Sequence, residues 1–309
     1  MTRVAAIDCG TNSIRLLVAD VDPTSGRLTD LDRRMTIVRL GQGVDRTGRL
    51  APEALERTFA ACRAYADVIE ELGAEKLRFV ATSASRDAEN RDDFVRGVVD
   101  ILGVEPEVIT GEQEAAFSFT GATAELQLGG AHPQHCLVVD VGGGSTEFVL
   151  GGERVEAARS VDIGCVRLTE RHQLTGEPLT EEQIAAVRAD IDKALDEAAE
   201  TVPLTEAHTL VGLAGTVTTL AGIALGLPEY DSAAIHRSVL SYEQVRTVTH
   251  RLIHATHDER AAIGVMHPGR VDVICAGALI VLAIMERTGA RELLVSEHDI
   301  LDGIAFSVA

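Results

Sequence analysis

The chain has 309 residues, of which 46% are hydrophobic and 25% charged, a composition that indicates a globular protein and excludes an intrinsically disordered one. This length suits two domains of ordinary size. The formal net charge of −20 argues against general nucleic-acid binding, because the protein would repel a polyanion at long range. Residues 1–60 nevertheless hold nine arginines against eight acidic residues, so positive charge for an anionic substrate is expected there.

No segment predicts export or insertion into a membrane. The first ten residues, MTRVAAIDCG, lack the length and cleavage site of a secretory signal, so we expect a cytoplasmic protein. The longest apolar stretch, 273–285, has 13 residues and predicts a buried helix, because a membrane span needs about 20. The five cysteines form no CxxC pair, so we expect reduced, buried thiols.

Strands and helices alternate along the chain. Apolar runs bounded by turn residues predict strands at 4–8, 14–21, 35–40, 77–82, 136–140, 145–152, 208–215 and 293–296. Helices are predicted from Pro52 to Gly73, at 94–102, from Thr110, from Thr180, from Thr216 and at 271–287. This alternation predicts an α/β fold.

The first strand, loop and strand recur later in the chain. DCGTNS at 8–13 aligns with DVGGGS at 140–145, 132 positions further on. Both copies read apolar strand, Asp, any residue, Gly, two small residues, Ser, apolar strand. The repeat predicts two similar domains, and we place the boundary in the polar stretch near residue 128, giving domains 1–128 and 129–309.

The glycine-rich loop after the strand at 136–140 is a candidate phosphate site. Glycines let a backbone approach an anion closely and direct successive N–H groups at it. No lysine follows them, which argues against a P-loop. The carboxylates Asp140 and Glu147 bracket the loop and suit Mg²⁺. A purely structural hairpin turn is the alternative. The expected phosphate-binding residues of this loop are Gly142, Gly143, Gly144 and Ser145.

The two loops resemble the two phosphate motifs of the acetate-kinase, sugar-kinase, heat-shock-chaperone and actin superfamily, and VGLAGT at 211–216 resembles its third, nucleotide-side motif. Within that superfamily, DCGTNSIRLLV, ATSASRDAENRDDF, VITGEQEA and LVVDVGGGSTEFVLG, in this order, resemble the exopolyphosphatase and guanosine pentaphosphate phosphohydrolase family over about residues 4–300. The resemblance implies two similar actin-like (ribonuclease H-like) α/β domains with a cleft between them, and a homodimer.

The resemblance also implies roles for particular residues. Glu114 matches the family's catalytic glutamate, which would hold and deprotonate the attacking water. Arg86 would grip phosphate oxygens, and Asp8 would reach the metal through water. Gln113 stands where the family often has a second glutamate. The loop residues that would contact phosphate in the first copy are Thr11, Asn12 and Ser13.

Other polar residues have both a functional and an ordinary interpretation. Alone, Glu114 would be an acidic residue favoured at a helix N-terminus, and Arg86 a surface arginine. Three histidines at helical spacing suggest either a metal site or, more commonly, a solvated helix face: His250, His254 and His257. The segments His236-Arg237 and HPGR at 267–270 either line a substrate channel or form surface loops. Asp302 stands where a family segment near the C-terminus usually has arginine.

The sequence thus predicts a hydrolase that removes terminal phosphate from inorganic polyphosphate with Mg²⁺ or Mn²⁺. Longer members of the family carry further C-terminal domains, which this chain lacks, so we expect a preference for short polyphosphate. Hydrolysis of guanosine pentaphosphate is the second interpretation, and a kinase or ATPase of the wider superfamily the third. A non-catalytic sensor of polyphosphate or nucleotide is the fourth.

Overall fold

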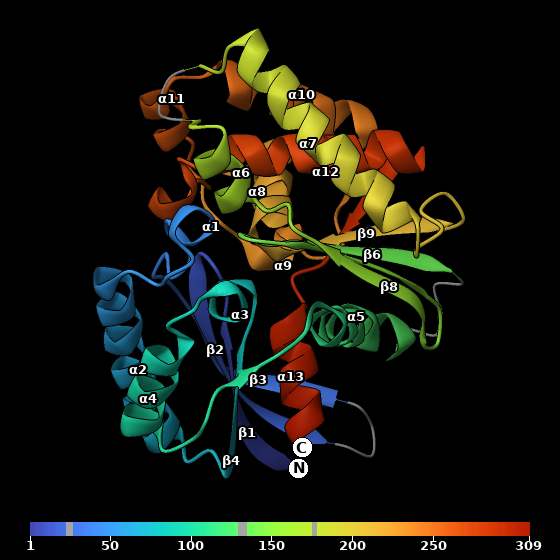
Figure 1. The fold of residues 1–309 in the computed structure, drawn as a ribbon. Helices are drawn as coiled ribbons and strands as arrows, with labels where there is room; N and C mark the ends of the chain where they lie inside the picture. The colour runs from blue at the N-terminus through green and yellow to red at the C-terminus, as the bar shows by residue number, and fades with distance from the viewer. Residues whose placement is uncertain (23–26, 129–134, 175–177) are drawn as a thin grey trace. The chain divides into compact units, whose positions relative to one another are not determined.

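The computed structural model describes residues 1–22, 27–128, 135–174 and 178–309. Contacts divide the chain into two units. Unit 1 consists of Met1–Ala131 together with Asp299–Ala309, and unit 2 of His132–His298. Each unit contains one mixed β-sheet with helices (Figure 1).

Unit 1 is built on a five-stranded sheet in the order β3-β2-β1-β4-β5, in which β1 runs antiparallel to β2 and parallel to β4. The strands are β1 (Thr2–Cys9), β2 (Ser13–Asp22), β3 (Arg27–Ile37), β4 (Lys76–Ala81) and β5 (Glu107–Val108). The helices are α1 (Val44–Thr47), α2 (Pro52–Leu72), α3 (Ser83–Asp87), α4 (Arg91–Leu102), α5 (Gly111–Leu128) and α13 (Ile300–Val308).

Unit 2 is built on a six-stranded sheet in the order β10-β11-β9-β6-β7-β8. The strands are β6 (Cys136–Val141), β7 (Thr146–Gly151), β8 (Val155–Val161), β9 (Thr209–Leu213), β10 (Val239–Ser241) and β11 (Glu292–Val295). The α-helices are α6 (Cys165–Arg171), α7 (Glu181–Ala199), α8 (Ala214–Ala224), α9 (Ser232–Ile235), α10 (Tyr242–His254), α11 (His257–Ala261) and α12 (Ile274–Thr288). A short 3₁₀ helix covers Pro268–Arg270.

The two sheets repeat one topology. The order β3-β2-β1-β4-β5 corresponds strand by strand to β8-β7-β6-β9-β11, with an antiparallel hairpin followed by parallel neighbours in both. Unit 2 adds β10 at its edge. The prediction of two similar actin-like α/β domains is therefore confirmed, and the sequence repeat at 8–13 and 140–145 falls at the same hairpin in each.

The sheet of unit 1 is covered on both faces. Residues of β1 alternate between two apolar clusters: Ala5 and Ile7 pack with α2 and α4, and Val4 and Ala6 pack with α13. Figure 1 shows α13 beside α5 on this second face. A strand buried on both faces reads as a continuous apolar run, which is why β1 was recognisable in the sequence.

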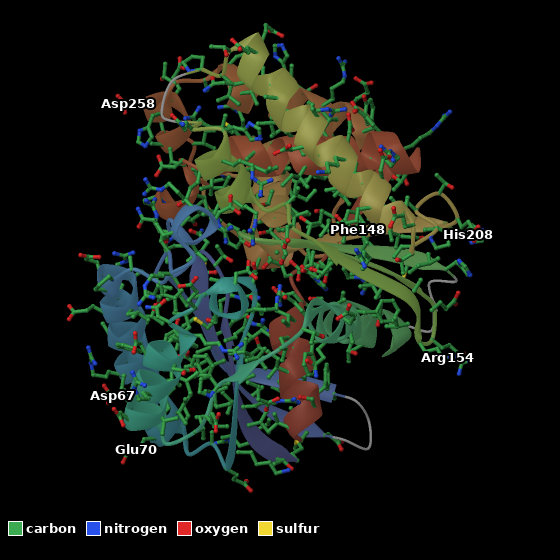
Figure 2. All side chains as sticks on the ribbon, viewed as in Figure 1. Asp67, Glu70, Phe148, Arg154, His208 and Asp258 are labelled. Atoms are coloured by element: carbon green, nitrogen blue, oxygen red, sulfur yellow. The ribbon has the colours of Figure 1, made fainter. Side chains whose placement is uncertain are left out.

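Burial separates the side chains in the expected way. Phe148 lies inside the core of unit 2, whereas Asp67 and Glu70 project outward from α2 (Figure 2).

All five cysteines are buried and free, as predicted, and burial raises the pKa of the Cys62 thiol to about 12. Helix α12 is buried, and none of the described helices has the combination of length and apolar character that a bilayer span requires.

Several helix boundaries follow the predicted chemistry. Helix α2 begins with Pro52 and ends at Gly73, whose φ of 67° is a conformation that glycine adopts without strain. At the start of α7, the Thr180 side chain accepts from the Gln183 amide and Gln183 caps the Thr180 amide in return.

Strand β3 differs from its prediction. The sequence suggested a strand at 35–40, but β3 spans Arg27–Ile37. Its many charged residues concealed it, because an exposed edge strand has little apolar surface to reveal it. On this strand the Arg34 guanidinium donates to Asp32 at 2.8 Å and 3.0 Å.

The predicted domain division differs from the observed units at the C-terminus. The prediction continued the second domain to Ala309, whereas α13 packs on α5, β1 and β2 and belongs to unit 1. The chain thus returns to its first sheet for the last helix. An apolar helix of nine residues carries no local signal of which sheet it covers, so its assignment needed the structure.

Candidate active site

The first loop, residues 10–13, turns its carbonyl groups into the protein. Gly10 donates to the Ser13 carbonyl at 2.9 Å, which closes the turn between β1 and β2. The Thr11 carbonyl accepts from Gly41 at 2.9 Å, and the Asn12 carbonyl accepts from two amides of residues 38–39. Among the described residues, the amides of Thr11 and Asn12 have no such acceptor. The loop therefore presents donors while its acceptors are satisfied.

Buried polar side chains beside this loop are unsatisfied. Thr11 Oγ1, Asn12 Oδ1 and Nδ2, and Ser85 Oγ have no hydrogen-bond partner within the described part of the chain, although all three residues are buried. Buried polar atoms normally have a partner. A phosphate oxygen would satisfy the hydroxyls and the amide nitrogen, so this arrangement fits an anion site.

Helix α3 and helix α5 bring further predicted residues to the same edge of the sheet. The loop follows β1, Ser85 and Arg86 follow β4, and Glu114 follows β5. These strands are parallel neighbours, so their carboxyl ends meet about 5 Å apart at one edge. Thr82 at the start of α3 donates to the Cys9 carbonyl at 3.1 Å, which fixes α3 beside the loop. Ligands of open α/β sheets bind at such edges.

Glu114 and Arg86 contact each other. Glu114 is buried in the first turn of α5, where its Oε2 accepts from Arg86 Nη1 at 3.2 Å. The same Nη1 donates to the Ile109 carbonyl at 2.9 Å. For Nε and Nη2 of Arg86 the described residues offer no hydrogen-bond acceptor, so that edge of the guanidinium is available to a phosphate. Arg86 can thus orient the glutamate and bind an anion together.

The capping interaction predicted before Glu114 is present. The Thr110 amide donates to Gln113 Oε1 at 2.9 Å, and the Gln113 amide donates to Thr110 Oγ1 at 3.3 Å. These bonds satisfy amides that would otherwise lack partners at the helix start. Gln113 therefore has a structural role here.

Asp8 lies directly across the first hairpin from Arg15. Asp8 Oδ2 accepts from Arg15 Nη2 at 2.7 Å and from Nε at 3.0 Å. Burial raises the pKa of the Asp8 carboxyl, and the Arg15 guanidinium offsets part of that rise. Asp8 is therefore already paired with a cation of its own unit, which the sequence analysis did not anticipate.

The second loop, residues 142–145, is built like the first. Gly142 donates to the Ser145 carbonyl at 3.1 Å, as Gly10 does to Ser13. The carbonyls of Gly142 and Gly143 accept from the first amides of α6, and the Gly144 carbonyl accepts from Arg167 Nε at 2.7 Å. Within the described chain, the amides at 143–145 donate to no protein group. This loop also presents its amides and fits an anion.

Gly164 allows α6 to approach the second loop. A methyl group at this position would overlap the carbonyl group of Gly143 and the amide of Gly144. The close approach lets the first turn of α6 bind the loop carbonyls, and so directs the loop amides the other way.

Asp140 and Glu147 form a direct cross-strand pair between β6 and β7. Both are buried, and the Oε1 of Glu147 accepts from Ser160 Oγ at 2.8 Å. Two carboxylates directly opposite each other repel, and burial increases the cost. A divalent cation between them would remove that cost. The described residues contain no cluster of three or more His, Cys, Asp or Glu, but Mg²⁺ needs only one or two protein carboxylates beside water and phosphate. The pair fits Mg²⁺.

A model of the Ppx/GppA phosphatase family matches residues 17–309 of the chain. The chain belongs to the Ppx/GppA phosphatase family. Exopolyphosphatase 2 of Mycobacterium tuberculosis is 52% identical, over 100% of this chain and 99% of its own length. The resemblance to this family is therefore confirmed.

Solved structures agree with this assignment. A crystal structure of an exopolyphosphatase-like protein is 44% identical, with a TM-score of 0.94, covering 99% of this chain and 97% of that one. The Ppx/GppA family member from Aquifex aeolicus is 33% identical, with a TM-score of 0.80, covering 99% and 97%.

The structure of this Ppx/GppA phosphatase also shows polar residues that sequence reasoning missed. The sequence patterns indicated no role for Arg15 or Ser85, and they indicated Arg270 only as part of the basic segment 267–270. A methyl group at Gly215, at the start of α8, would overlap the Arg270 guanidinium. Ala214 just before it has a φ of 67°, a strained value for a residue with a side chain. A charged residue within the apolar run IRLLVADV was the available signal for Arg15.

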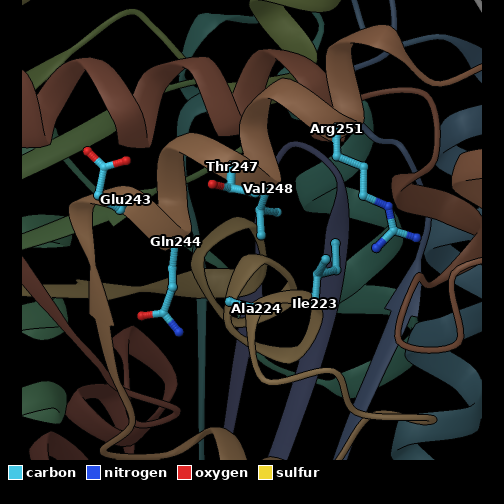
Figure 3. A pocket seen from close by; sticks show the side chains of 7 residues that line it. All are labelled: Ile223, Ala224, Glu243, Gln244, Thr247, Val248 and Arg251. Carbon is cyan, nitrogen blue, oxygen red and sulfur yellow. The ribbon is translucent and has the colours of Figure 1, made fainter.

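Two other features of unit 2 hold no predicted site residue. A surface pocket of about 360 Å³ lies between α8 and α10 (Figure 3). Its polar lining includes one acid, Glu243, and one arginine, Arg251, which gives it no preference for anions. His250 and His254 are exposed and stack with ring centroids 4.1 Å apart. The solvated interpretation of that helix face therefore describes this pair.

Proposed function

We propose that this Ppx/GppA phosphatase is an exopolyphosphatase, which hydrolyses the terminal phosphoanhydride of inorganic polyphosphate and releases orthophosphate. The buried Asp140–Glu147 pair beside a loop of unpaired amides carries the proposal, because it combines a cation site with a phosphate site. The relative that is 52% identical over the whole chain and named Exopolyphosphatase 2 supports the same substrate. Hydrolysis of guanosine pentaphosphate is not favoured by these relatives.

In this proposal Glu114 acts as the general base. Its carboxylate, oriented by Arg86, would hold the attacking water and accept its proton. Thr11, Asn12 and the second edge of Arg86 would bind phosphate oxygens. Because phosphoryl transfer requires mainly positioning and charge stabilisation, these donors suffice for the part that unit 1 plays.

Asp140 and Glu147 would hold Mg²⁺, with Mn²⁺ as a substitute, and amides of residues 142–145 would bind phosphate. The metal would supply positive charge to phosphate oxygens. Ser160 holds one oxygen of Glu147 and so fixes the direction of its carboxylate. Asp8 is already paired with Arg15, so it would hold the hairpin of loop 10–13 in place instead of binding the metal directly.

One assay tests the proposal. Phosphate release by the purified protein is measured in parallel on short polyphosphate, long polyphosphate, guanosine pentaphosphate and ATP, each with and without Mg²⁺. The proposal expects metal-dependent release that is fastest from short polyphosphate. Faster release from guanosine pentaphosphate would support the second interpretation, and binding without release would support a sensor.

The cytoplasmic location and the homodimer expected from the family resemblance belong to this proposal too. Cell fractionation tests the first, and light scattering of the purified protein during size-exclusion chromatography tests the second. A membrane-bound fraction or a monomer would contradict the corresponding expectation.

A further inference from the structure

Arg15 binds two buried carboxylates at once. Its Nε and Nη2 donate to Asp8, and its Nη1 donates to Asp299. The side chains of Asp8 and Asp299 are only 7% and 6% exposed. Removing one member would leave a buried charge without its partner, which is costly. The arginine therefore ties the hairpin that carries loop 10–13 to the residue immediately before α13.

The first turn of α13 is itself tightly organised. Asp299 Oδ1 accepts from the Leu301 amide at 3.0 Å, and Asp302 Oδ2 accepts from the Asp299 amide at 3.0 Å. Asp302 also receives the Arg33 guanidinium from β3, at 2.5 Å and 3.3 Å. Each acid thus caps the helix with one bond and holds an arginine of the sheet with another. This explains why aspartate works at position 302 in place of the arginine expected there.

The first turn of α13 also packs against α5, the helix that carries the proposed base Glu114. A methyl group at Gly121 of α5 would overlap the Asp299 carbonyl, and one at Gly303 would overlap the Phe117 carbonyl. Glu114, Phe117 and Gly121 are spaced by three and four residues, so they lie on one stripe of α5, about 10 Å long. The backbones of α5 and α13 are therefore in direct contact along the stripe that begins with Glu114.

We propose that Asp299 is a positioning residue, which holds phosphate loop 10–13 through Arg15 and the base helix α5 through the Gly121 contact, so that the two keep one relative position. The inference rests on the proposed function for the identity of the reaction. Asp299 touches neither the loop's unsatisfied polar atoms nor Glu114 itself. A displacement of about 1 Å at a reacting group can lower the rate about a hundredfold, so such a link affects turnover strongly.

The chain offers a matched control for the test. Asp20 pairs with Arg3 across the same two strands, at the opposite end of the hairpin, with Nε to Oδ1 at 2.8 Å. Asp20→Asn and Asp299→Asn each remove one carboxylate charge from an ion pair with a β1–β2 arginine. Only Asp299 lies between loop 10–13 and α5. Each variant weakens one ion pair of the hairpin, with a smaller expected loss of stability for Asp20, which is 26% exposed against 6% for Asp299. A positioning effect would follow from Asp299→Asn alone.

The experiment measures kcat and KM for short polyphosphate in both variants and in Arg15→Lys. We expect Asp299→Asn to lower kcat by about tenfold or more with a smaller change in KM, and Asp20→Asn to leave kcat within about twofold. Arg15→Lys should reproduce the loss, because lysine keeps the charge but cannot bind both acids in the same geometry. Loss of stability without loss of kcat in the folded fraction of Asp299→Asn would overturn the inference.

Hydrogen exchange tests the same link without relying on activity. Asp299→Asn should speed exchange of the amides that hold loop 10–13, at Gly10 and at residues 38–41, together with amides in the first turn of α5, and Asp20→Asn should speed exchange at neither place. Faster exchange confined to α13 would overturn the inference, whatever the substrate. An inactive wild-type protein would instead refute the proposed function, and the exchange result would still decide the positioning role.

Discussion

The two hairpins of this molecule repeat one design and carry opposite charges at one equivalent position. In each, an aspartate is the second-to-last residue of the first strand and a glycine amide donates to a serine carbonyl. The two amides that follow this glycine donate to no group in the described part of the chain. The residue opposite the aspartate is Arg15 in the first copy and Glu147 in the second. Asp8 thus shares Arg15 with a second acid of unit 1, Asp299, whereas the proposed function assigns a cation to the acidic pair of the second copy.

This difference separates the two roles that phosphoryl transfer needs. Unit 1 contributes phosphate donors and the proposed base, and in this unit Glu114 is already bonded to Arg86 and Asp8 to Arg15. Unit 2 contributes the buried Asp140–Glu147 pair, to which the proposed function assigns the metal. One loop design therefore serves two purposes, and the residue opposite the aspartate decides between them.

The largest expected effect comes from the base in unit 1. Glu114→Ala should lower kcat by about 10² or more and leave both KM and the Mg²⁺ requirement nearly unchanged, because general-base catalysis typically contributes that much. Steady-state kinetics at a series of Mg²⁺ concentrations measure kcat, KM and the Mg²⁺ requirement. Glu112→Ala, an exposed acid in the same helical turn, is the control and should remain close to wild type. Activity of Glu114→Ala within a few-fold of wild type would exclude it as the base.

An arginine at position 147, as at the equivalent position 15, should lower activity nearly as much as Glu114→Ala does. Glu147→Arg would pair Asp140 as Arg15 pairs Asp8, so it should abolish metal-dependent stabilisation and lower phosphate release about a hundredfold. Thermal unfolding with and without Mg²⁺ separates this from misfolding, and Glu147→Gln tests the charge without the added bulk. Retention of a metal-induced rise in Tm in Glu147→Arg would contradict the account.

A smaller effect is expected where the second loop meets α6. Gly164→Ala places a methyl group against the loop backbone and should destabilise the protein by about 2 kcal/mol. In the described part of unit 1, the carbonyls of Thr11 and Asn12 accept from amides of residues 38–41 instead of from a helix. Denaturant unfolding measures the change. Gly152→Ala, in the turn after β7, is a control outside this contact. Equal stability of Gly164→Ala and wild type would show that the approach of α6 is not required.

The smallest expected effect is on chain length. Residues 61–309 carry 19 basic and 40 acidic side chains, a net charge of −21, so phosphate units beyond the site should meet repulsion. That repulsion extends about 30 Å at 0.01 M salt and shortens as salt is added. The specificity constant per chain end should stay flat or fall as the polyphosphate lengthens. Added salt should reduce the difference in this constant between short and long chains. A steep rise with length, measured on size-fractionated polyphosphate, would indicate a basic track that the charge distribution does not reveal.

Local chemistry made much of this molecule predictable from its sequence. The loops at 10–13 and 142–145, the capping bonds of Thr110 and Thr180, and the helix end at Gly73 depend on residues close in the chain, so each carried its own signal. The placement of Glu114 followed from such a cap together with the family resemblance.

What escaped prediction depends on partners distant in the chain. Arg15 meets Asp299, 284 positions away, and Arg33 meets Asp302, 269 positions away. No local pattern connects these residues, so neither the second acid on Arg15 nor the return of α13 to unit 1 could be inferred. Strand β3 was misplaced for a different reason, because it is a mostly exposed edge strand and its sequence lacks a regular apolar alternation.

The most direct test compares the two aspartates that the repeat makes equivalent. Asp140→Asn and Asp8→Asn are prepared side by side, and the Mg²⁺ concentration for half-maximal phosphate release is measured for each. The account predicts that Asp140→Asn raises this concentration about tenfold or more, because a metal ligand loses its charge, while Asp8→Asn changes it by less than about twofold. Equal shifts in both variants, or no shift in Asp140→Asn, would contradict the assignment of the metal to the second hairpin.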